Sequence, residues 1–392
     1  MDLTPYRECP AHKQWIFIAN GNAGQAYTEE FYRPCCWFKN SISAKDPAEF
    51  YSKLSTMDIE TNCEVCINME KSGSWSPRTA FIESVHSDKT LVITASFDNL
   101  CNLKCITCSP ENSTQIATEL IKTNSNQDDI RWFTRLKTQA PSKVEFIKQL
   151  LSEYEFDELR FELLGGEPLI NPMVLEFIDW LALQPYAKKT FLNITTNGTK
   201  CHKIHTYIRS FKRVSVQLSV DGIEDTFEYI RSGADYVELN DSINYYYIFY
   251  EIGMNNKTYN FSMSFNYTLS WMNAMHFGKF ITWLSNTYPK VPSLLITKLL
   301  GPDKYSIDIL STNQRKQIYE KSMSMIDVES LNAGLVDAVN IYKQHMFSAG
   351  DTSFNLVKFN DALNTMTHLD QLRNTSYQNV FDETIDFIHT NI

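Results

Sequence analysis

Nine cysteines are the side chains of this chain with the most evident chemistry. Eight of them fall within the first 110 of 392 residues, and only Cys201 lies beyond. An odd number excludes a complete set of intrachain disulfides, and the first eight residues lack the pattern of a signal peptide. Clustered cysteines in a reducing compartment more often hold metal than form disulfides. We therefore expect a cytoplasmic protein in which most of these thiols are metal ligands.

Three of the cysteines share one short loop. Cys101, Cys105 and Cys108 have the spacing C-x3-C-x2-C and directly follow a predicted strand. Thiolates are soft ligands that select iron–sulfur clusters or zinc. Three of them can bind three irons of a [4Fe–4S] cluster and leave the fourth iron open. A structural zinc site would normally have a fourth ligand. A zinc knuckle and three buried thiols remain the alternatives for this loop.

A second group of cysteines precedes this loop. Cys63 and Cys66 form a C-x2-C pair, and Cys9, Cys35 and Cys36 lie before it. Four thiolates drawn from separate turns can hold a second [4Fe–4S] cluster or a structural zinc ion. Cys201 stands alone after an Asn-Gly turn, so a free thiol is its expected state.

Alternating strand and helix patterns follow the cysteine-rich region. Apolar and β-branched runs predict strands at 90–97, 159–164, 190–195, 213–220, 260–267 and 294–297. Helical spacing predicts helices around 144–151 and at 172–183, 203–211, 240–252, 273–284, 313–326, 335–347 and 355–372. Repeated strand–helix units of this length predict an α/β fold with a parallel sheet. We expect three parts: a cysteine-rich domain at 1–87, an α/β core at 88–302 and a helical extension at 303–392.

Small polar residues follow several of these strands. Three such strand ends are Gly165-Gly166-Glu167-Pro168, Thr195-Thr196-Asn197-Gly198 and Ser219-Val220-Asp221-Gly222. Each of them taken alone is an ordinary turn sequence. Because ligands bind at the carboxyl edge of parallel sheets, the three together predict a ligand site there.

Composition and charge exclude some classes of function. The chain is 43% hydrophobic and 21% charged, as in ordinary globular proteins. No apolar stretch is long enough to cross a membrane. A net charge of −10 argues against non-specific binding to nucleic acid.

The cysteine loop and the Gly-Gly-Glu-Pro segment together resemble the radical S-adenosylmethionine superfamily. Thr107 departs from the pattern, because the superfamily usually has an aromatic residue before the third cysteine. The resemblance implies a partial (β/α)6 TIM-type barrel, a [4Fe–4S] cluster and bound S-adenosyl-L-methionine. It implies that Gly165, Gly166, Glu167 and Pro168 hold the amino group of S-adenosylmethionine. By the same resemblance, Thr195, Asn197, Ser219 and Asp221 contact its ribose or methionine part, and Arg231 pairs with its carboxylate.

The N-terminal cysteines resemble the auxiliary-cluster module known as SPASM or twitch. The parallels are Cys9-Pro10, Gly21, Gly24, Arg33-Pro34-Cys35-Cys36-Trp37, Cys63-x2-Cys66, Glu70, Gly73, Ser76 and Arg78. In better-known members this module follows the barrel, whereas here it precedes it. The resemblance implies an auxiliary [4Fe–4S] cluster on Cys9, Cys35, Cys63 and Cys66. Cys36 is the alternative to Cys35, and His12 is a less favoured ligand.

The resemblance also implies a reaction and partners. Such an oxidoreductase takes an electron from an external donor such as flavodoxin or ferredoxin. It cleaves S-adenosylmethionine and abstracts hydrogen from a substrate, for which a peptide is the first expectation. A nucleoside, sugar or lipid substrate is one alternative, and a non-catalytic zinc-stabilised binding protein is another.

Overall fold

The computed structural model describes residues 3–18, 32–85, 87–123, 127–200, 204–256, 260–290, 293–348 and 350–390. Gly21, Gly24 and Cys201 lie outside the described residues. The chain forms two compact units, which interleave in sequence. Unit 1 comprises residues 1–101, 109–195 and 203–215, and unit 2 comprises residues 102–108, 196–202 and 216–392.

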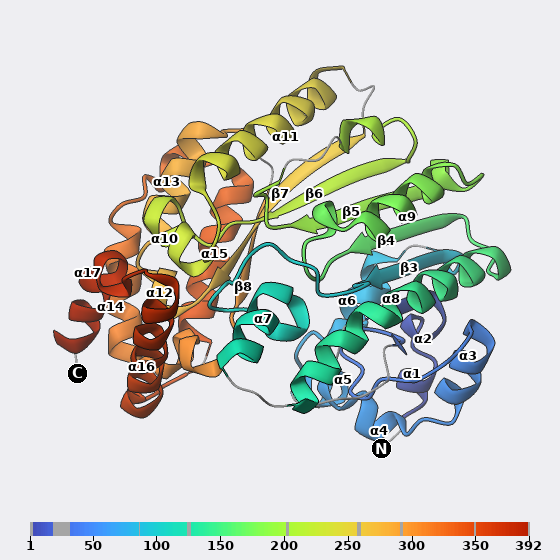
Figure 1. Cartoon of the computed structure of the whole chain (residues 1–392), viewed down its shortest axis with the longest axis horizontal. Helices are drawn as coiled ribbons and strands as arrows, with labels where there is room; N and C mark the ends of the chain where they lie inside the picture. The colour runs from blue at the N-terminus through green and yellow to red at the C-terminus, as the bar shows by residue number, and fades with distance from the viewer. Residues whose placement is uncertain are drawn as a thin grey trace. The chain divides into compact units, whose positions relative to one another are not determined.

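The described strands form one sheet in the order β2-β1-β3-β4-β5-β6-β7-β8. Figure 1 labels strands β3 to β8. Their bounds are β1 Trp15–Ile18, β2 Tyr32–Arg33, β3 Thr90–Ala95, β4 Glu158–Leu163, β5 Thr190–Thr196, β6 Arg213–Ser219, β7 Phe261–Leu269 and β8 Leu294–Lys298. The pairs β1–β3, β3–β4, β4–β5 and β7–β8 are parallel, and β1–β2 is antiparallel. The six predicted strands correspond to β3–β8, which confirms the α/β fold of a partial barrel.

Unit 1 contains the N-terminal segment and the first strand–helix units. Its helices are α1 Thr4–Arg7, α2 Ala11–Gln14, α3 Pro47–Ser55, α4 Ile59–Asn62, α5 Glu64–Lys71, α6 Pro77–Ser84, α7 Thr114–Thr123, α8 Gln127–Glu153 and α9 Pro172–Ala182. The sequence showed little helical periodicity before residue 88, yet α1–α6 lie there. They are short helices, and three of them, α3, α4 and α6, begin at a side-chain cap. The side chains of Asp46, Asp58 and Ser76 each accept a backbone N–H in the first turn.

Strands β3 and β4 form the core of this unit. Every residue of β3 is buried, as expected for a central parallel strand. In β4 the buried residues alternate with half-buried ones, and Phe161 packs against Phe177 of α9. Phe177 also meets Phe97, which follows β3. These rings fix the end of β3, from which the cysteine loop departs.

Unit 2 contains the later strand–helix units and the C-terminal helices. Its helices are α10 Glu224–Ile230, α11 Tyr236–Asn256, α12 Trp271–Ala274, α13 Phe277–Thr287, α14 Thr312–Met323, α15 Ala333–Phe347, α16 Leu356–Arg373 and α17 Tyr377–Thr390. The predicted helices of the extension correspond to α14–α16, whereas α17 was not predicted. The helix expected at 203–211 is wrong in extent, because only a 3₁₀ turn at Ile204–Thr206 forms in its described part.

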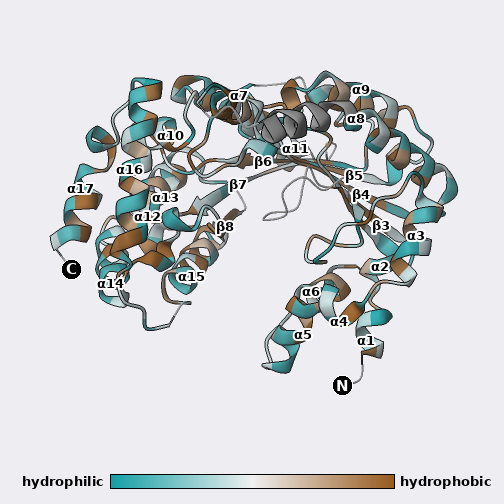
Figure 2. Cartoon of the chain, turned by 60° about the horizontal axis from the view of Figure 1, so that its bottom comes forward, coloured by the Kyte–Doolittle hydropathy of each residue, from teal (hydrophilic) through white to brown (hydrophobic). Residues whose placement is uncertain are grey.

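Buried polar contacts fix the C-terminal helices to one another. The Arg315 side chain of α14 is fully buried and donates hydrogen bonds to the carbonyls of Met346 and Gly350. Gln314 donates to the carbonyl of Ile388 in α17. In Figure 2 these helices carry both hydrophobic and hydrophilic residues along their lengths. Among the described residues, we find no helix with the length and apolar character that crossing a membrane requires.

A buried lysine supports the end of β3. The Nζ atom of Lys143, on α8, donates hydrogen bonds of 3.1 and 3.0 Å to the carbonyls of Ser96 and Phe97. Its side chain is fully buried. Burial lowers the pKa of Lys143 to about 7, against the opposing effect of the nearby Asp98 carboxylate. The lysine therefore holds the backbone from which the cysteine loop begins.

This pKa predicts a pH-dependent contribution to stability. Lys143 has a pKa of 10.5 in the unfolded chain and of about 7 in the folded chain. Between these two pH values the amine is protonated in the unfolded chain and neutral in the folded chain. The free energy of unfolding should therefore rise with pH across this range, by up to about 1.4 kcal/mol per pH unit from this group. Lys143→Met should lack this contribution. Urea unfolding between about pH 7 and 9 measures it, and parallel pH profiles of the two proteins would contradict it.

Candidate functional site

The cysteine loop leaves β3 within unit 1 and reaches Cys101 in a fixed backbone conformation. Asp98 accepts hydrogen bonds from the Leu100 N–H and from the side chain of Asn171, both at 2.8 Å. The Cys101 N–H donates to the Thr114 hydroxyl, which in turn donates to the Cys101 carbonyl. Thr114 is the first residue of α7, so this helix positions the first cysteine of the loop.

The Gly-Gly-Glu-Pro segment lies directly against the residue before Cys101. The Glu167 N–H donates a 2.7 Å hydrogen bond to the Leu100 carbonyl. Gly166 has a φ of +55°, and a Cβ placed there would overlap that same carbonyl oxygen. Glycine is therefore required at 166 for both conformation and space. The Glu167 side chain is buried and accepts the Leu169 N–H, and Pro168 begins a 3₁₀ turn.

The remainder of the loop belongs to unit 2. The N–H groups of Lys104 and Ile106 donate 2.8 Å hydrogen bonds to the carbonyls of Ser232 and Ile230. The side chains of Leu103 and Ile106 are buried, whereas Cys105 and Cys108 are half-buried. The buried apolar side chains anchor the loop, and the thiols of Cys105 and Cys108 remain partly exposed. A loop without regular structure thus acquires the hydrogen bonds that its backbone needs.

Asn197 holds the loop from the end of β5. Its Nδ2 atom donates to Oδ1 of Asn102 at 3.0 Å, and Asn102 donates to the Thr199 hydroxyl at 2.8 Å. The Thr199 hydroxyl donates back to Oδ1 of Asn197 at 2.8 Å. Asn197 was predicted to contact S-adenosylmethionine, and in the structure its amide group closes this ring with Asn102. This ring joins Asn197 to the loop, and its contact with S-adenosylmethionine stays a prediction.

Asp221 and Arg231 form an ion pair beside the last two cysteines. Nη2 of Arg231 lies 2.8 Å from Oδ2 of Asp221, and Oδ1 of Asp221 accepts the Thr268 N–H at 2.8 Å. Burial lowers the pKa of Arg231, whereas the Asp221 carboxylate and the thiols of Cys105 and Cys108 raise it. The second effect is larger, so the pKa of Arg231 lies above its ordinary value. The guanidinium is therefore a fixed cation close to those thiols.

The other two predicted residues lie at strand ends. Ser219 is the last residue of β6 and is buried. Thr195 is the penultimate residue of β5 and is half-buried.

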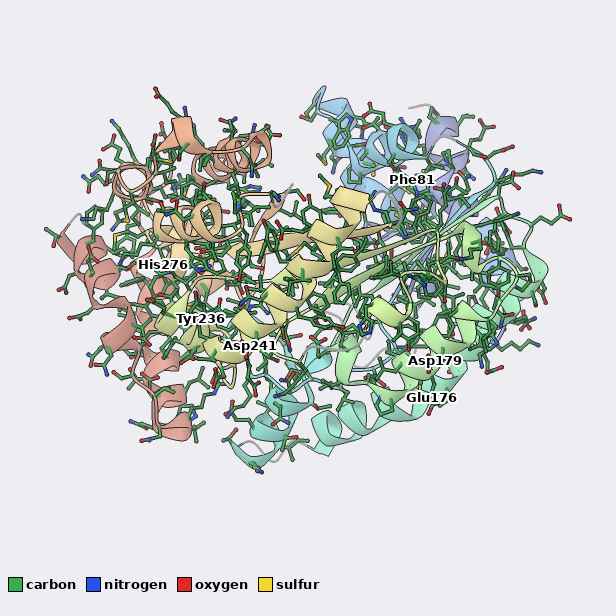
Figure 3. The ribbon with its side chains drawn as sticks, turned by 90° about the horizontal axis from the view of Figure 1, so that it is seen from above. Phe81, Glu176, Asp179, Tyr236, Asp241 and His276 are labelled. Atoms are coloured by element: carbon green, nitrogen blue, oxygen red, sulfur yellow. The ribbon has the colours of Figure 1, made fainter. Side chains whose placement is uncertain are left out.

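The N-terminal cysteines meet around one pocket of unit 1. Cys9, Cys35, Cys63 and Cys66 line it together with His12, and the described residues that line it do not include Cys36. Its wall also contains Phe81, which Figure 3 labels. The Phe81 ring stacks on Trp15 with ring centroids 5.2 Å apart. The four thiols come from the segment after α1, the turn after β2 and the start of α5. Nε2 of His12 lies 3.8 Å from Sγ of Cys63.

Burial keeps these thiols protonated in the absence of metal. It raises the pKa of Cys63 to about 12 and that of Cys36 to about 11, and it raises the pKa values of Cys9, Cys35 and Cys66. The thiol of Cys36, and after it those of Cys9 and Cys63, raise the pKa of Cys35 further, and the thiols of Cys66 and Cys9 raise the pKa of Cys63. Such mutual repulsion requires thiols that lie close together. A bound metal would have to displace their protons.

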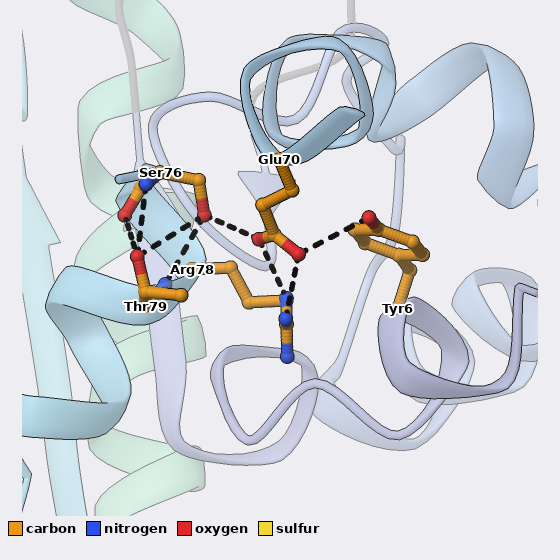
Figure 4. A network of polar contacts seen from close by, with 5 residues as sticks. All are labelled: Tyr6, Glu70, Ser76, Arg78 and Thr79. Carbon is orange, nitrogen blue, oxygen red and sulfur yellow. Dashed lines mark hydrogen bonds and ion pairs between the residues drawn. The ribbon is translucent and has the colours of Figure 1, made fainter. Parts of the chain in front are cut away.

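A carboxylate and a guanidinium, those of Glu70 and Arg78, form a network of polar contacts near the N-terminal cysteines (Figure 4). Glu70 accepts two hydrogen bonds from Arg78, at 3.0 and 2.7 Å, and one each from Tyr6 and Ser76. Hydrogen bonding to Arg78 is the largest cause that lowers the pKa of Glu70. Burial raises the pKa of Cys66, while bonds from the Arg78 backbone and the Ser76 side chain lower it. We call Tyr6, Glu70, Ser76 and Arg78 the Glu70 cluster.

The donor sets consist of thiols, which suit iron–sulfur clusters or zinc. Within the described residues, no three His, Cys, Asp or Glu side chains are placed as ligands of one metal ion. Four thiols line the N-terminal pocket, and three lie on the loop at 101–108. A [4Fe–4S] cluster can use either donor count, with one iron left open where only three thiolates bind.

Comparisons with known proteins found only distant similarity. No family model and no curated protein matches this chain. The structure "Native anSMEcpe with bound AdoMet and Cp18Cys peptide" matches with a TM-score of 0.37 and 17% identity over 67% of this chain. The match spans 62% of that protein's length. Streptococcus suis SuiB bound to S-adenosylmethionine matches with a TM-score of 0.37 and 12% identity, over 82% of this chain and 58% of its own. TYW1 with a lysine-pyruvate adduct bound matches with a TM-score of 0.30 and 12% identity, over 60% and 71%.

The close approach of Gly166 predicts a position-specific effect of a small substitution. Gly166→Ala combines a backbone cost of about 1–2 kcal/mol with overlap on the Leu100 carbonyl. The variant should melt at a lower temperature and retain less iron after reconstitution. Gly350→Ala is the matched control, because its φ is +64° and no atom lies within 4 Å of the added Cβ. Equal effects of the two substitutions would contradict the steric argument.

The Glu70 cluster predicts a second difference between matched variants. Glu70→Gln removes the charge that holds Arg78 and should lower the free energy of unfolding by about 1–2 kcal/mol. It should also speed the loss of iron from the N-terminal cysteines. Glu64→Gln, on the same helix, breaks only the exposed 3.0 Å pair with Lys39 and should change stability by less than about 1 kcal/mol. Urea unfolding and timed iron release measure both effects.

Proposed function

We propose that this chain is a radical S-adenosylmethionine enzyme with a second iron–sulfur cluster in its N-terminal region. The observation that carries the proposal is the contact between two motifs that are distant in sequence. Gly166 and Glu167 meet the carbonyl of Leu100, the residue before Cys101. A zinc knuckle would give no reason for a glycine-rich strand end to meet the first ligand of the loop.

Cys101, Cys105 and Cys108 would hold a [4Fe–4S] cluster with one iron left open. When bound, that cluster supplies the electron for cleavage of S-adenosylmethionine to a 5′-deoxyadenosyl radical, which abstracts hydrogen from the substrate. The chain's own residues hold the loop and its charge. Lys104 and Ile106 fix the backbone, and Arg231 offsets the negative charge of the thiolates of Cys105 and Cys108.

The strand ends would bind S-adenosylmethionine. Backbone carbonyls at 165–168 are the proposed partners of its amino group. Ser219, the last residue of β6, and Thr195, the penultimate residue of β5, would offer hydroxyl groups to the ribose or methionine part. The guanidinium of Arg231 is paired with the Asp221 carboxylate, so the carboxylate of S-adenosylmethionine would have to bind a different nitrogen of the same guanidinium. Its Nε atom has no partner in the described part of the chain and is the donor left for this contact.

Cys9, Cys35, Cys63 and Cys66 would hold the auxiliary cluster. Because the pocket includes Trp37 and Phe81 as well as the thiols, its wall is largely apolar. The cluster there would pass an electron to or from the substrate or bind the substrate directly. The resemblance to SPASM and twitch modules makes a peptide the first substrate to test, with flavodoxin or ferredoxin as the electron donor.

Iron content and S-adenosylmethionine cleavage test the proposal. Protein purified without oxygen and reconstituted with iron and sulfide should bind about eight irons per chain, as two cubane clusters require. Replacing Cys101, Cys105 and Cys108 with Ala should remove about half of this iron and abolish formation of 5′-deoxyadenosine. The matched variant replaces the lone Cys201 with Ala and should retain both. Stoichiometric zinc in place of iron, or cleavage that survives the triple substitution, would overturn the proposal.

A further inference from the structure

The C-terminal helices make direct contact with the cysteine loop. Nη1 of Arg373, at the end of α16, donates a 3.0 Å hydrogen bond to the carbonyl of Lys104. Lys104 lies between Cys101 and Cys105, and its own N–H is bonded to the Ser232 carbonyl. The N–H of Lys104 is therefore bonded to the segment after α10, and its carbonyl is bonded to the end of α16.

Asp370 fixes the turn that follows Arg373. Its Oδ1 atom accepts hydrogen bonds from the hydroxyls of Tyr229, at 2.9 Å, and Thr375, at 2.6 Å. Its Oδ2 atom accepts the Tyr377 N–H at 2.7 Å, which starts α17. Asn374 ends α16 in the left-handed conformation, with a φ of +54°. Thus one carboxylate determines the turn between α16 and α17 from which Arg373 projects.

Tyr229 connects this turn to the other support of the loop. Its ring packs edge to face against Phe381 of α17, with centroids 5.2 Å apart. Tyr229 is the penultimate residue of α10, and the next residue, Ile230, accepts the Ile106 N–H. Burial and the hydrogen bond to Asp370 raise the pKa of Tyr229, so its hydroxyl remains a donor. The two supports of the loop are therefore joined through Asp370.

We propose that the C-terminal helices are part of the radical centre and that Arg373 is a positioning residue for the cysteine loop. Arg373 and Asp370 hold the backbone between the first two cysteines, which sets where Cys105 presents its thiolate. A charge-assisted hydrogen bond to a carbonyl contributes more than a neutral one. The inference rests on the proposed function, because it assigns Arg373 a role in holding the cluster of that site.

Substitution of Arg373 tests this role in the full-length, reconstituted protein. Arg373→Ala should release the iron of the cysteine loop to a chelator roughly tenfold faster, since one charge-assisted bond is lost. The change that S-adenosylmethionine causes in the electron paramagnetic resonance spectrum of the reduced protein should weaken. Arg373→Lys should restore part of both effects, because an ammonium can still donate to one carbonyl. Tyr229→Phe keeps the ring and should give an intermediate loss.

A neighbouring substitution provides the control. Gln371 is exposed on the same helix, and Gln371→Ala should match the wild type in iron release and spectrum. If Arg373→Ala fails to fold, the comparison of Arg373→Lys with wild type decides the matter by the same two measurements. Wild-type iron release and an unchanged spectrum in the Arg373 variants would overturn the inference while leaving the proposed function intact. A wild-type protein without iron at the loop would overturn both.

Discussion

The backbone hydrogen bonds of Lys104 and Ile106 are the interaction on which the cysteine loop depends. The loop lies outside any helix or strand from Ser96 to Ser109, so each buried polar group along it needs a partner from elsewhere. The carbonyls of Ser232 and Ile230 provide two of these partners. Because two alternate N–H groups bond to alternate carbonyls, the loop runs beside this segment as a short ladder. This register fixes the backbone on either side of Cys105.

Both cysteine sites place an arginine–carboxylate pair close to the thiols. Arg231 and Asp221 lie beside Cys105 and Cys108, and Arg78 and Glu70 lie beside Cys9 and Cys66. Burial alone favours protonated thiols, which bind metal poorly. A guanidinium fixed by a carboxylate offsets part of the thiolate charge without needing a new partner when metal binds. The two sites therefore solve one electrostatic problem in the same way, although they lie in different units.

The strands could be predicted from the sequence because apolar and β-branched residues mark them, as a continuous buried run in β3 and in alternation in β4, β5 and β7. Strands β3–β8 lie within a few residues of the predicted ranges. The short helices α1–α6 could not be predicted, because capping and local turns rather than periodicity determine them. The sequence also could not predict which charged side chains pair with each other. Asp221 and Arg231 were taken as separate ligands of S-adenosylmethionine, yet they bind each other. Lys143 sits within a helical pattern that gives no sign that its amine supports the carbonyls after β3. Arg373 shows only the ordinary pattern of a basic residue in the last helical turn.

The distance in sequence between the loop and its supports has a consequence for assembly. Arg373 lies 269 residues after Lys104, and the carbonyls of Ile230 and Ser232 also come long after the loop. Contacts of such separation form late, because the chain must close large loops before they contribute. Unit 2 accordingly includes residues 102–108 together with the C-terminal helices, although β3 belongs to unit 1. We therefore expect the loop to reach its final conformation only after the segment at 230–232 and the C-terminal helices have formed. The geometry that its cysteines offer to a cluster then depends on residues far along the chain.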